Sequence, residues 1–199
     1  MRLMMKKIKK IKESVTELEF KKLISFTKCD ESIREHTRNN LLRTFTILYY
    51  TGLRLNELQT LRIKHIKTLF EKSQVKVTLS KTSSERKIYL TDAFKKDLIK
   101  LFDFASEEEE NLVISKGANK NKRTSINNIV FISQINTYMK KVLNDNFTSH
   151  SFRQGIITEM SSKSINTKVI SQFIGHKNVT TTMRYERYTD NQIIDCLVR

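Results

Sequence analysis

The chain has 199 residues, and its 37 Lys and Arg against 21 Asp and Glu leave a formal net charge of +16. This length allows one domain with a hydrophobic core, or one domain with an appendage, and excludes two full-sized domains. The positive excess predicts a polyanionic partner. No apolar run approaches the roughly 18–20 residues that cross a bilayer, so we expect a soluble protein with no membrane partner.

The cysteine count and the codon-related composition bear on the compartment. Cys29 and Cys196 are isolated from each other and from any pair of histidines at zinc-ligand spacing. This argues against a disulfide framework and a structural metal site. Proline and tryptophan are absent and lysine outnumbers arginine, which is typical of an AT-rich genome. We therefore expect an intracellular protein, from a bacterial cytoplasm or from an organelle with such a genome.

The chain is predicted to begin with a basic arm and a helix. Residues 1–12 carry six basic groups and no acid, so we expect residues 1–15 to be a solvated arm or the start of a helix, with DNA contact or targeting as the alternative. Thr16 and Glu19 then form a capping-box pattern. Together with the apolar spacing that follows, this pattern predicts a helix over about 16–27.

Helical spacing continues after this first helix. It predicts a core helix over 37–50, which Gly52 is expected to end, and a short helix over 53–61. The apolar face of the core helix consists of Leu41, Leu42, Phe45, Leu48 and Tyr49.

A β-hairpin is predicted next. Val75, Val77 and Leu79 alternate with other residues, and Ile88 and Leu90 alternate again after a polar stretch. Period-two spacing of this kind is typical of strands, and the polar stretch between them is the expected turn.

An amphipathic stretch over 91–104 and an exposed polar loop over 106–124 are predicted after the hairpin. The loop contains the acidic run Glu107 to Glu110. Consecutive acids cannot all face one point, so we interpret this run as a solvated surface rather than a metal site.

The remaining chain is predicted to be helical, at about 126–143, 150–162, 166–174, 179–188 and 191–198. With the earlier helices and the single hairpin, this predicts a mainly α fold with a small antiparallel β-sheet. The chain has only four glycines, and Gly52, Gly155 and Gly175 each lie beside a polar motif. We expect each of them to need a positive φ or a close backbone approach.

Three polar segments stand out along the chain: 51–58, 150–153 and 175–185. Taken singly, each has a plain structural explanation. Arg54 and Glu57 are spaced as an ordinary helical ion pair, and His150 and Arg153 as polar residues on one helical face. Their joint occurrence favours a shared chemical function.

Together these segments contain groups that break a phosphodiester without a metal, which requires a nucleophile, fixed cations and an acid for the departing oxygen. The guanidinium groups of Arg54 and Arg153 can each bind a phosphate bidentately, and Glu57 is spaced to hold Arg54. His150, one helical turn before Arg153, can donate to the same phosphate or exchange protons with the nucleophile. His176 adds another donor.

Tyr185 and Lys81 complete the set. Tyr185 is a phenol on a predicted helix at the end of the third segment, and we interpret it as the nucleophile, with Tyr188 as the alternative three residues on. Lys81 lies at the end of the first predicted strand, where its ammonium could protonate the leaving oxygen. Its neighbours Arg86 and Lys87 are expected to bind backbone phosphates at most, or to be solvated turn cations.

These segments resemble the motifs of the tyrosine recombinase, or phage integrase, family: an Arg in T-G-x-R-x-x-E-L, a Lys on a β-hairpin, an H-x-x-R helix and G-H-x-x-x-x-T-T-x-x-Y. The resemblance covers about residues 16–189, nearly the whole of that family's catalytic domain, and leaves 190–199 as a C-terminal helical tail. It implies the catalytic-domain fold of the family. The catalytic set that it implies is Arg54, Glu57, Lys81, His150, Arg153, His176 and Tyr185.

The resemblance implies a site-specific recombinase or integrase of double-stranded DNA. Such an enzyme cleaves through a covalent 3′-phosphotyrosyl bond and rejoins the strands, with no metal, ATP or other cofactor. It also implies a DNA-associated location and a homo-oligomer, a tetramer, on DNA. The apolar stripe of the tail 190–199 either packs on its own domain or docks into a neighbouring subunit.

The chain departs from the family pattern at two points. Family members usually carry a separate helical domain before the catalytic one, whereas only a short segment precedes it here, so a separate core-binding or accessory protein is a further expected partner. Gln154 and Gly155 also stand where a further His or Arg is common.

Three other functions remain as alternatives. The first is a non-catalytic DNA-binding remnant, against which the full set of catalytic side chains argues. The second is a type IB topoisomerase, which religates the same strand, although the spacing of the last motif favours a recombinase. The third is a basic RNA-binding protein, which leaves the order of the motifs unexplained.

Overall fold

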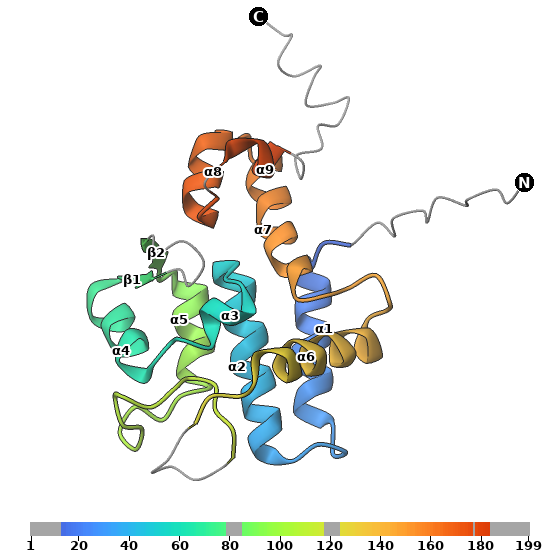
Figure 1. Cartoon of the computed structure of the whole chain (residues 1–199), viewed down its shortest axis with the longest axis vertical. Helices are drawn as coiled ribbons and strands as arrows, with labels where there is room; N and C mark the ends of the chain where they lie inside the picture. Colours follow the sequence, from blue (N-terminus) through green and yellow to red (C-terminus); the bar gives the residue numbers. More distant parts are fainter. Residues whose placement is uncertain (1–12, 79–84, 118–123, 177, 184–199) are drawn as a thin grey trace, which may run out of the picture.

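The computed structural model describes residues 13–78, 85–117, 124–176 and 178–183 (Figure 1). Within these ranges the chain forms helices and one two-stranded antiparallel sheet, which confirms the predicted fold class. No helix in this part of the chain is both long and apolar enough to span a membrane. The elements are α1 (Glu17–Cys29), α2 (Glu35–Thr51), α3 (Leu55–Leu58), α4 (Ile63–Lys72), β1 (Gln74–Thr78), β2 (Glu85–Tyr89), α5 (Asp92–Ile99), α6 (Asn128–Val142), α7 (His150–Ser162), α8 (Thr167–Ile174) and α9 (Val179–Met183).

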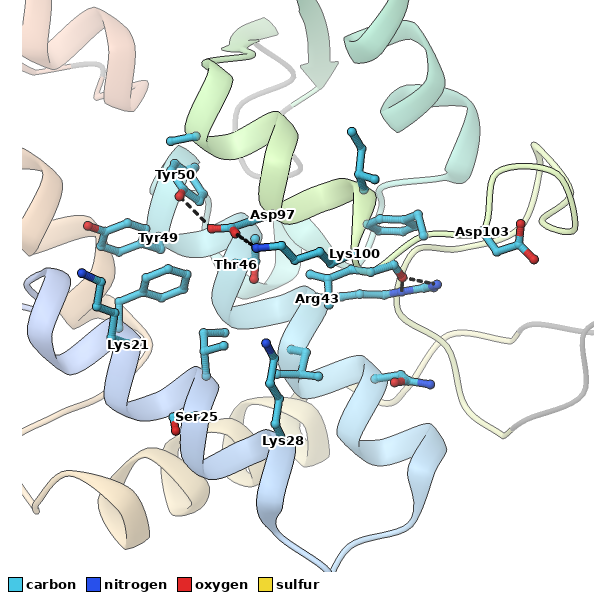
Figure 2. Close-up of a pocket in the computed structure, with 18 of the residues that line it drawn as sticks. Lys21, Ser25, Lys28, Arg43, Thr46, Tyr49, Tyr50, Asp97, Lys100 and Asp103 are labelled. Atoms are coloured by element: carbon cyan, nitrogen blue, oxygen red, sulfur yellow. Dashed lines mark hydrogen bonds and ion pairs between the residues drawn. The ribbon is translucent and has the colours of Figure 1, made fainter.

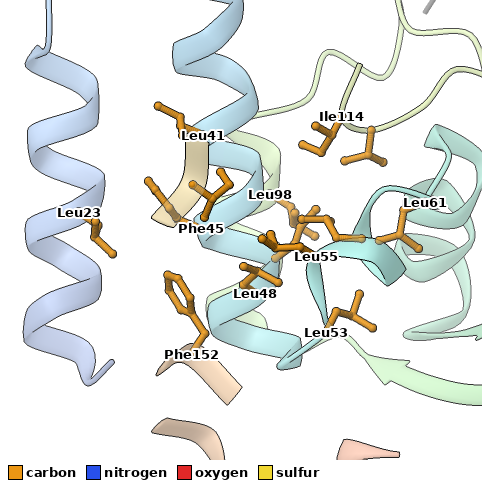
Figure 3. Close-up of a cluster of buried hydrophobic side chains, with 14 of the residues drawn as sticks. Leu23, Leu41, Phe45, Leu48, Leu53, Leu55, Leu61, Leu98, Ile114 and Phe152 are labelled. Atoms are coloured by element: carbon orange, nitrogen blue, oxygen red, sulfur yellow. The ribbon is translucent and has the colours of Figure 1, made fainter. Parts of the chain in front are cut away.

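Helix α2 lies at the centre of the fold, in contact with α1, α3, α5 and α7 (Figure 1). Phe45 and Leu48 of α2 are fully buried, and they lie among Leu23 of α1, Phe152 of α7 and Leu98 of α5 (Figure 3). Burying a side chain of this size contributes roughly 1.5–3 kcal/mol. The carboxyl end of α2 is therefore held rigidly in the middle of the molecule.

Capping interactions define the ends of the first two helices. The backbone N–H of Thr16 donates to Glu19 Oε2 at 2.9 Å, which confirms the predicted capping box at the start of α1. At the carboxyl end of α2, Gly52 has φ +59° and its backbone N–H donates to the carbonyl of Leu48 at 2.8 Å. A left-handed residue at this position ends the helix and turns the chain, as predicted.

The predicted hairpin is present, and its register buries one unexpected side chain. Val75 pairs with Ile88 and Val77 with Arg86, and all four side chains are buried. The prediction of Arg86 as a solvated turn cation or phosphate contact is therefore wrong. The alternation of the strand decides this, because Arg86 has the same parity as Ile88 and points to the same face.

Two predictions between α2 and α6 also need correction. The short helix expected over 53–61 covers only Leu55–Leu58, and helix α4 (Ile63–Lys72) was missed. The buried residues Ile63, Ile66 and Leu69 do have helical spacing, but basic residues interrupt it in the sequence. The chain turns between the two helices because Leu61 donates from its backbone N–H to the carbonyl of Leu58.

The segment predicted as an exposed loop over 106–124 is partly buried. Val113 and Ile114 belong to the core, and Glu107 is buried in an ion pair with Arg43 of α2. Arg43 also donates to the carbonyl of Leu101. The acidic run is therefore not simply a solvated surface, because its first member, Glu107, is drawn inward by its ion pair with Arg43.

Gly155, on α7, lies against the segment that enters α1. A Cβ at this position would stand 2.2 Å from the carbonyl oxygen of Val15, and the N–H of Val15 donates to the carbonyl of Ser151 at 3.0 Å. This confirms the expected close backbone approach at Gly155. The expected positive φ is confirmed at Gly52 and Gly175, where φ is +59° and +73°.

Gly155→Ala is expected to lower the free energy of unfolding by about 1–3 kcal/mol, because backbone atoms of Val15 must move to admit the methyl group. Each kcal/mol corresponds to roughly 2–4 °C in melting temperature for a chain of this size. Thr158→Ala, on the same helix, is the control and should change the melting temperature little. Equal melting temperatures for the two variants would contradict the close approach.

Candidate active site

Residues that are far apart in the sequence line one small pocket of about 240 Å³. Arg54 precedes α3, while His150 and Arg153 lie in the first turn of α7. All three line this pocket, together with Asn128 and Asn136 of α6. The predicted convergence of the first two motifs is therefore observed.

Glu57 holds Arg54 as the spacing indicated. Its Oε1 accepts from Arg54 Nη1 at 2.7 Å, and its Oε2 accepts from the backbone N–H of Arg54 at 2.9 Å. The Glu57 side chain is 4% exposed, whereas that of Arg54 is 30% exposed. A buried carboxylate thus fixes a guanidinium that still reaches the surface, which is the arrangement needed to present a charge to a ligand.

Arg153 is held between the carboxyl ends of two helices. Its Nη1 donates to the carbonyl of Gly52, after α2, at 2.9 Å, and its Nη2 to that of Ile174, the last residue of α8, at 2.7 Å. Carbonyl groups at a helix end lack partners within the helix and carry partial negative charge. They stabilise the buried guanidinium of Arg153, which is 5% exposed.

His176 joins the site from the turn after α8. The backbone N–H of His176 donates to the carbonyl of Ser171 at 2.9 Å, and the preceding residue, Gly175, adopts φ +73°. Arg153 Nε donates to His176 Nε2 at 3.3 Å, and His176 Nδ1 lies 2.8 Å from Thr182 Oγ1 in α9. Since Nε2 accepts a hydrogen bond, the proton of the neutral ring is on Nδ1 and is donated to Thr182.

The surroundings of His176 keep its ring neutral at pH 7. Burial lowers its pKa, and the positive charges of Arg153, Arg54 and Arg86 lower it further, to about 4. Three guanidinium groups therefore act on one imidazole. A site with this excess of positive charge attracts an anion such as a phosphodiester.

Two residues of this arrangement were not predicted from the sequence. Thr182 is fully buried and holds the ring of His176, and Arg86 is buried beside Arg54 and Glu57. The repeated Thr181–Thr182 in the motif was the available signal for the first. Among the described residues, no three His, Cys, Asp or Glu side chains gather where they could hold a metal ion.

Lys81 and Tyr185 lie outside the described residues, as does Tyr188. In the sequence, Lys81 falls between the ends of β1 and β2, and Tyr185 follows α9 by two residues. Their membership of the site stays a prediction, and so do the individual catalytic roles of the five residues that the structure does describe.

A larger hollow of about 1490 Å³ lies elsewhere, among α1, α2, α5 and the segment that follows α5 (Figure 2). Tyr50 donates there to Asp97, which also binds Lys100, and Arg43 forms its buried ion pair with Glu107. None of the predicted site residues lines this hollow. The motifs that predict the reacting site therefore point to the smaller pocket and not to this hollow.

Comparison with known proteins agrees with the motifs. The tyrosine recombinase XerA of Pyrococcus horikoshii is 26% identical over 189 residues, covering 95% of this chain and 61% of that protein. This chain thus spans about three-fifths of the length of that relative.

Solved structures share the fold. A crystal structure of XerA recombinase superposes with a TM-score of 0.70 at 22% identity, covering 94% of this chain and 64% of that one. The Tn1549 transposon integrase in complex with transposon right end DNA gives a TM-score of 0.73 at 17% identity, covering 96% and 66%. The model of the phage integrase family matches residues 13–192. With its motifs, its fold and this match, the chain belongs to the phage integrase family.

Proposed function

We propose that this chain cleaves and rejoins strands of double-stranded DNA as a site-specific recombinase or integrase, through a covalent 3′-phosphotyrosyl intermediate and without metal or ATP. The observation that carries the proposal is the convergence of Arg54, Arg153 and His176 from three separate segments, with His150 at the same pocket as the two arginines. This is a set of donors and cations that suits a phosphodiester in its pentacovalent transition state.

In the proposed reaction the Tyr185 oxygen attacks the phosphorus and the bond from phosphorus to the 5′ oxygen breaks. The tyrosine proton passes to His150, and Lys81 protonates the departing 5′ oxygen. Arg54 and Arg153 stabilise the charge on the nonbridging oxygens. Attack by the 5′-hydroxyl of another strand reverses these steps and restores the phosphodiester.

His176 and Glu57 have supporting roles in this proposal. With its ring proton donated to Thr182, neutral His176 accepts a hydrogen bond from Arg153 Nε and so orders that guanidinium. Glu57 keeps the Arg54 guanidinium at the pocket. Because phosphotyrosine stores the energy of the broken bond, rejoining requires no nucleotide.

The proposal extends to organisation and partners. The catalytic domain covers 16–189, preceded by the basic segment 1–15, whose last residue Val15 packs against α7, and followed by the tail 190–199. The partners are double-stranded DNA and further copies of the chain in a tetramer on that DNA. The location is intracellular and DNA-associated, in a bacterial nucleoid or an organelle with an AT-rich genome.

A trapping experiment tests this function. The protein is incubated with a labelled pool of nicked duplexes that have randomised sequence around the nick, so that cleavage releases a short fragment and leaves the protein attached. We expect a denaturant-resistant protein–DNA adduct. Its absence with the whole pool would favour the non-catalytic remnant, and relaxation of supercoiled DNA without strand exchange would favour a topoisomerase.

Mapping the attachment point sharpens the result. Trypsin cleaves after Arg184 and Arg187, so Tyr185 and Tyr188 fall in different peptides, 185–187 and 188–199. Mass spectrometry of the nuclease-trimmed adduct should find the residual nucleotide on the shorter peptide. A nucleotide on the longer peptide would overturn the assignment of the nucleophile.

A further inference from the structure

We propose that Arg86 of β2 is a positioning residue of this site, which fixes the β-hairpin to the carboxyl end of α2. Its Nη2 donates to the carbonyl of Thr51 and its Nη1 to that of Gly52, at 3.4 Å for the latter. Thr51 is the last residue of α2 and Gly52 leads directly to the site. The role of Arg86 in catalysis rests on the proposed function, whereas its contacts with Thr51 and Gly52 are independent of that function.

The carbonyl of Gly52 links two arginines. It accepts from Arg86 Nη1 and also from Arg153 Nη1, the latter at 2.9 Å. One oxygen thus joins β2 to α7, and any shift of the hairpin displaces an acceptor on which Arg153 depends. A side-chain substitution at Gly52 would be strained at its φ of +59°, and its Cβ would stand 3.1 Å from Ile156 and from Ile174. The shared acceptor is therefore held in place from several directions.

Arg86 also contacts the other elements of the site. Its guanidinium lies 5.1 Å from the ring centroid of Phe173 in α8, over the ring face. The charge of Glu57 stabilises its protonated form, while that of Arg54 opposes it. Arg86 therefore touches or faces α2, α3 and α8, the same elements that present Arg54 and the turn to His176.

The energetic cost of burying Arg86 favours a functional role. The side chain is 4% exposed, and its Nε is buried with no hydrogen-bond partner within the described part of the chain. Burial lowers its pKa to about 10, so it stays charged at pH 7. A buried ion can often be replaced by apolar residues without loss of stability. Buried charges that do not serve stability are found mainly at functional sites.

The hairpin position matters for catalysis because Lys81 lies five residues before Arg86. In the proposed reaction its ammonium protonates the leaving oxygen, which requires placement within hydrogen-bond reach. Arg86 anchors the start of β2, the described element that follows Lys81 in the sequence. Misplacement of a reacting group by about 1 Å costs roughly 100-fold in rate.

Arg86→Gln and Arg86→Lys test the proposal, with Lys76→Gln as a control that removes one exposed charge from the partner strand. Adduct formation with the nicked duplex pool is followed in single turnover at saturating DNA. We expect Arg86→Gln to be slower by about 100-fold, and Lys76→Gln to stay within about twofold. Arg86→Lys keeps the charge but loses the planar, rigid guanidinium that spans the two carbonyls, so a loss of roughly tenfold is expected.

A second readout does not need cleavage. The pKa of His176 is measured by NMR titration of the free protein, where the charges that face it are Arg153, Arg54 and Arg86. Loss of the Arg86 charge should raise this pKa from its value of about 4 in Arg86→Gln, and leave it nearly unchanged in Arg86→Lys. A residue that only filled space away from the site would not move it.

These readouts separate the two claims. If wild-type protein forms no adduct, the proposed function fails, and the pKa of His176 still decides whether Arg86 faces the site. A folded Arg86→Gln with the wild-type rate and an unchanged His176 pKa would overturn the proposal. If Arg86→Gln does not melt cooperatively, Arg86→Lys decides, and a rate within twofold of wild type would also overturn it.

Discussion

Tyr185→Phe is expected to abolish the covalent protein–DNA adduct, a loss of at least ~10⁴-fold, because the ring remains but no oxygen is left to attack phosphorus. The assay is the trapping reaction with nicked duplexes, resolved on a denaturing gel. DNA binding should stay within about twofold of wild type, since a single uncharged oxygen contributes little to a contact dominated by phosphate charge.

Tyr188→Phe is the matched control, because it removes the same atom three residues further on. It should retain the adduct. If the adduct survives in Tyr185→Phe and disappears in Tyr188→Phe, the nucleophile has been assigned to the wrong phenol. If the adduct also survives in the double variant Tyr185→Phe/Tyr188→Phe, neither phenol is the nucleophile and the proposed chemistry fails.

Arg54→Ala and Arg153→Ala are each expected to slow adduct formation by about 10²–10³-fold, the usual loss for one donor that stabilises transition-state charge. Their effects on stability should differ. Arg153 donates to the carbonyl of Ile174 and shares that of Gly52 with Arg86, so its removal deprives the Ile174 acceptor of this donor, at a cost of about 1–3 kcal/mol. Arg54 is 30% exposed, so its removal should lower the melting temperature less.

Arg62→Ala is the control for a lost arginine charge, because Arg62 pairs with Glu110 at the surface and does not line the pocket. Rates and dissociation constants are measured together over a range of salt concentrations. Loss of cleavage with nearly constant binding is expected for both site variants. Parallel losses of cleavage and binding, equal to those of Arg62→Ala, would contradict a role at the reacting phosphate.

Local sequence patterns were sufficient to predict most of the secondary structure. The capping box at Thr16 and Glu19, the glycine stop after α2 and the alternation of the hairpin each depend on neighbours within a few residues. Predictions were weaker where long-range contacts decide the outcome. The segment around Glu107 was expected to be exposed, yet Arg43, distant in the sequence, draws that carboxylate into the core.

The contacts of the site also fall into those that local spacing predicts and those that depend on the fold. The pairing of Arg54 with Glu57, and the placement of His150 with Arg153 on one helical face, follow from spacings of three residues and were available from the sequence alone. The roles of the Gly52 carbonyl and of Thr182 required the fold, because their partners come from other elements.

Residue order, helical period and motif spacing were therefore sufficient to identify the family, the fold class and the charged groups around the pocket. Tertiary structure alone decided that Arg86 donates to the end of α2, that Arg153 lies between two helix ends, and that Thr182 holds the ring of His176. The physical reason is that burial and hydrogen bonding between distant segments depend on how whole elements pack, and no short stretch of sequence encodes that packing.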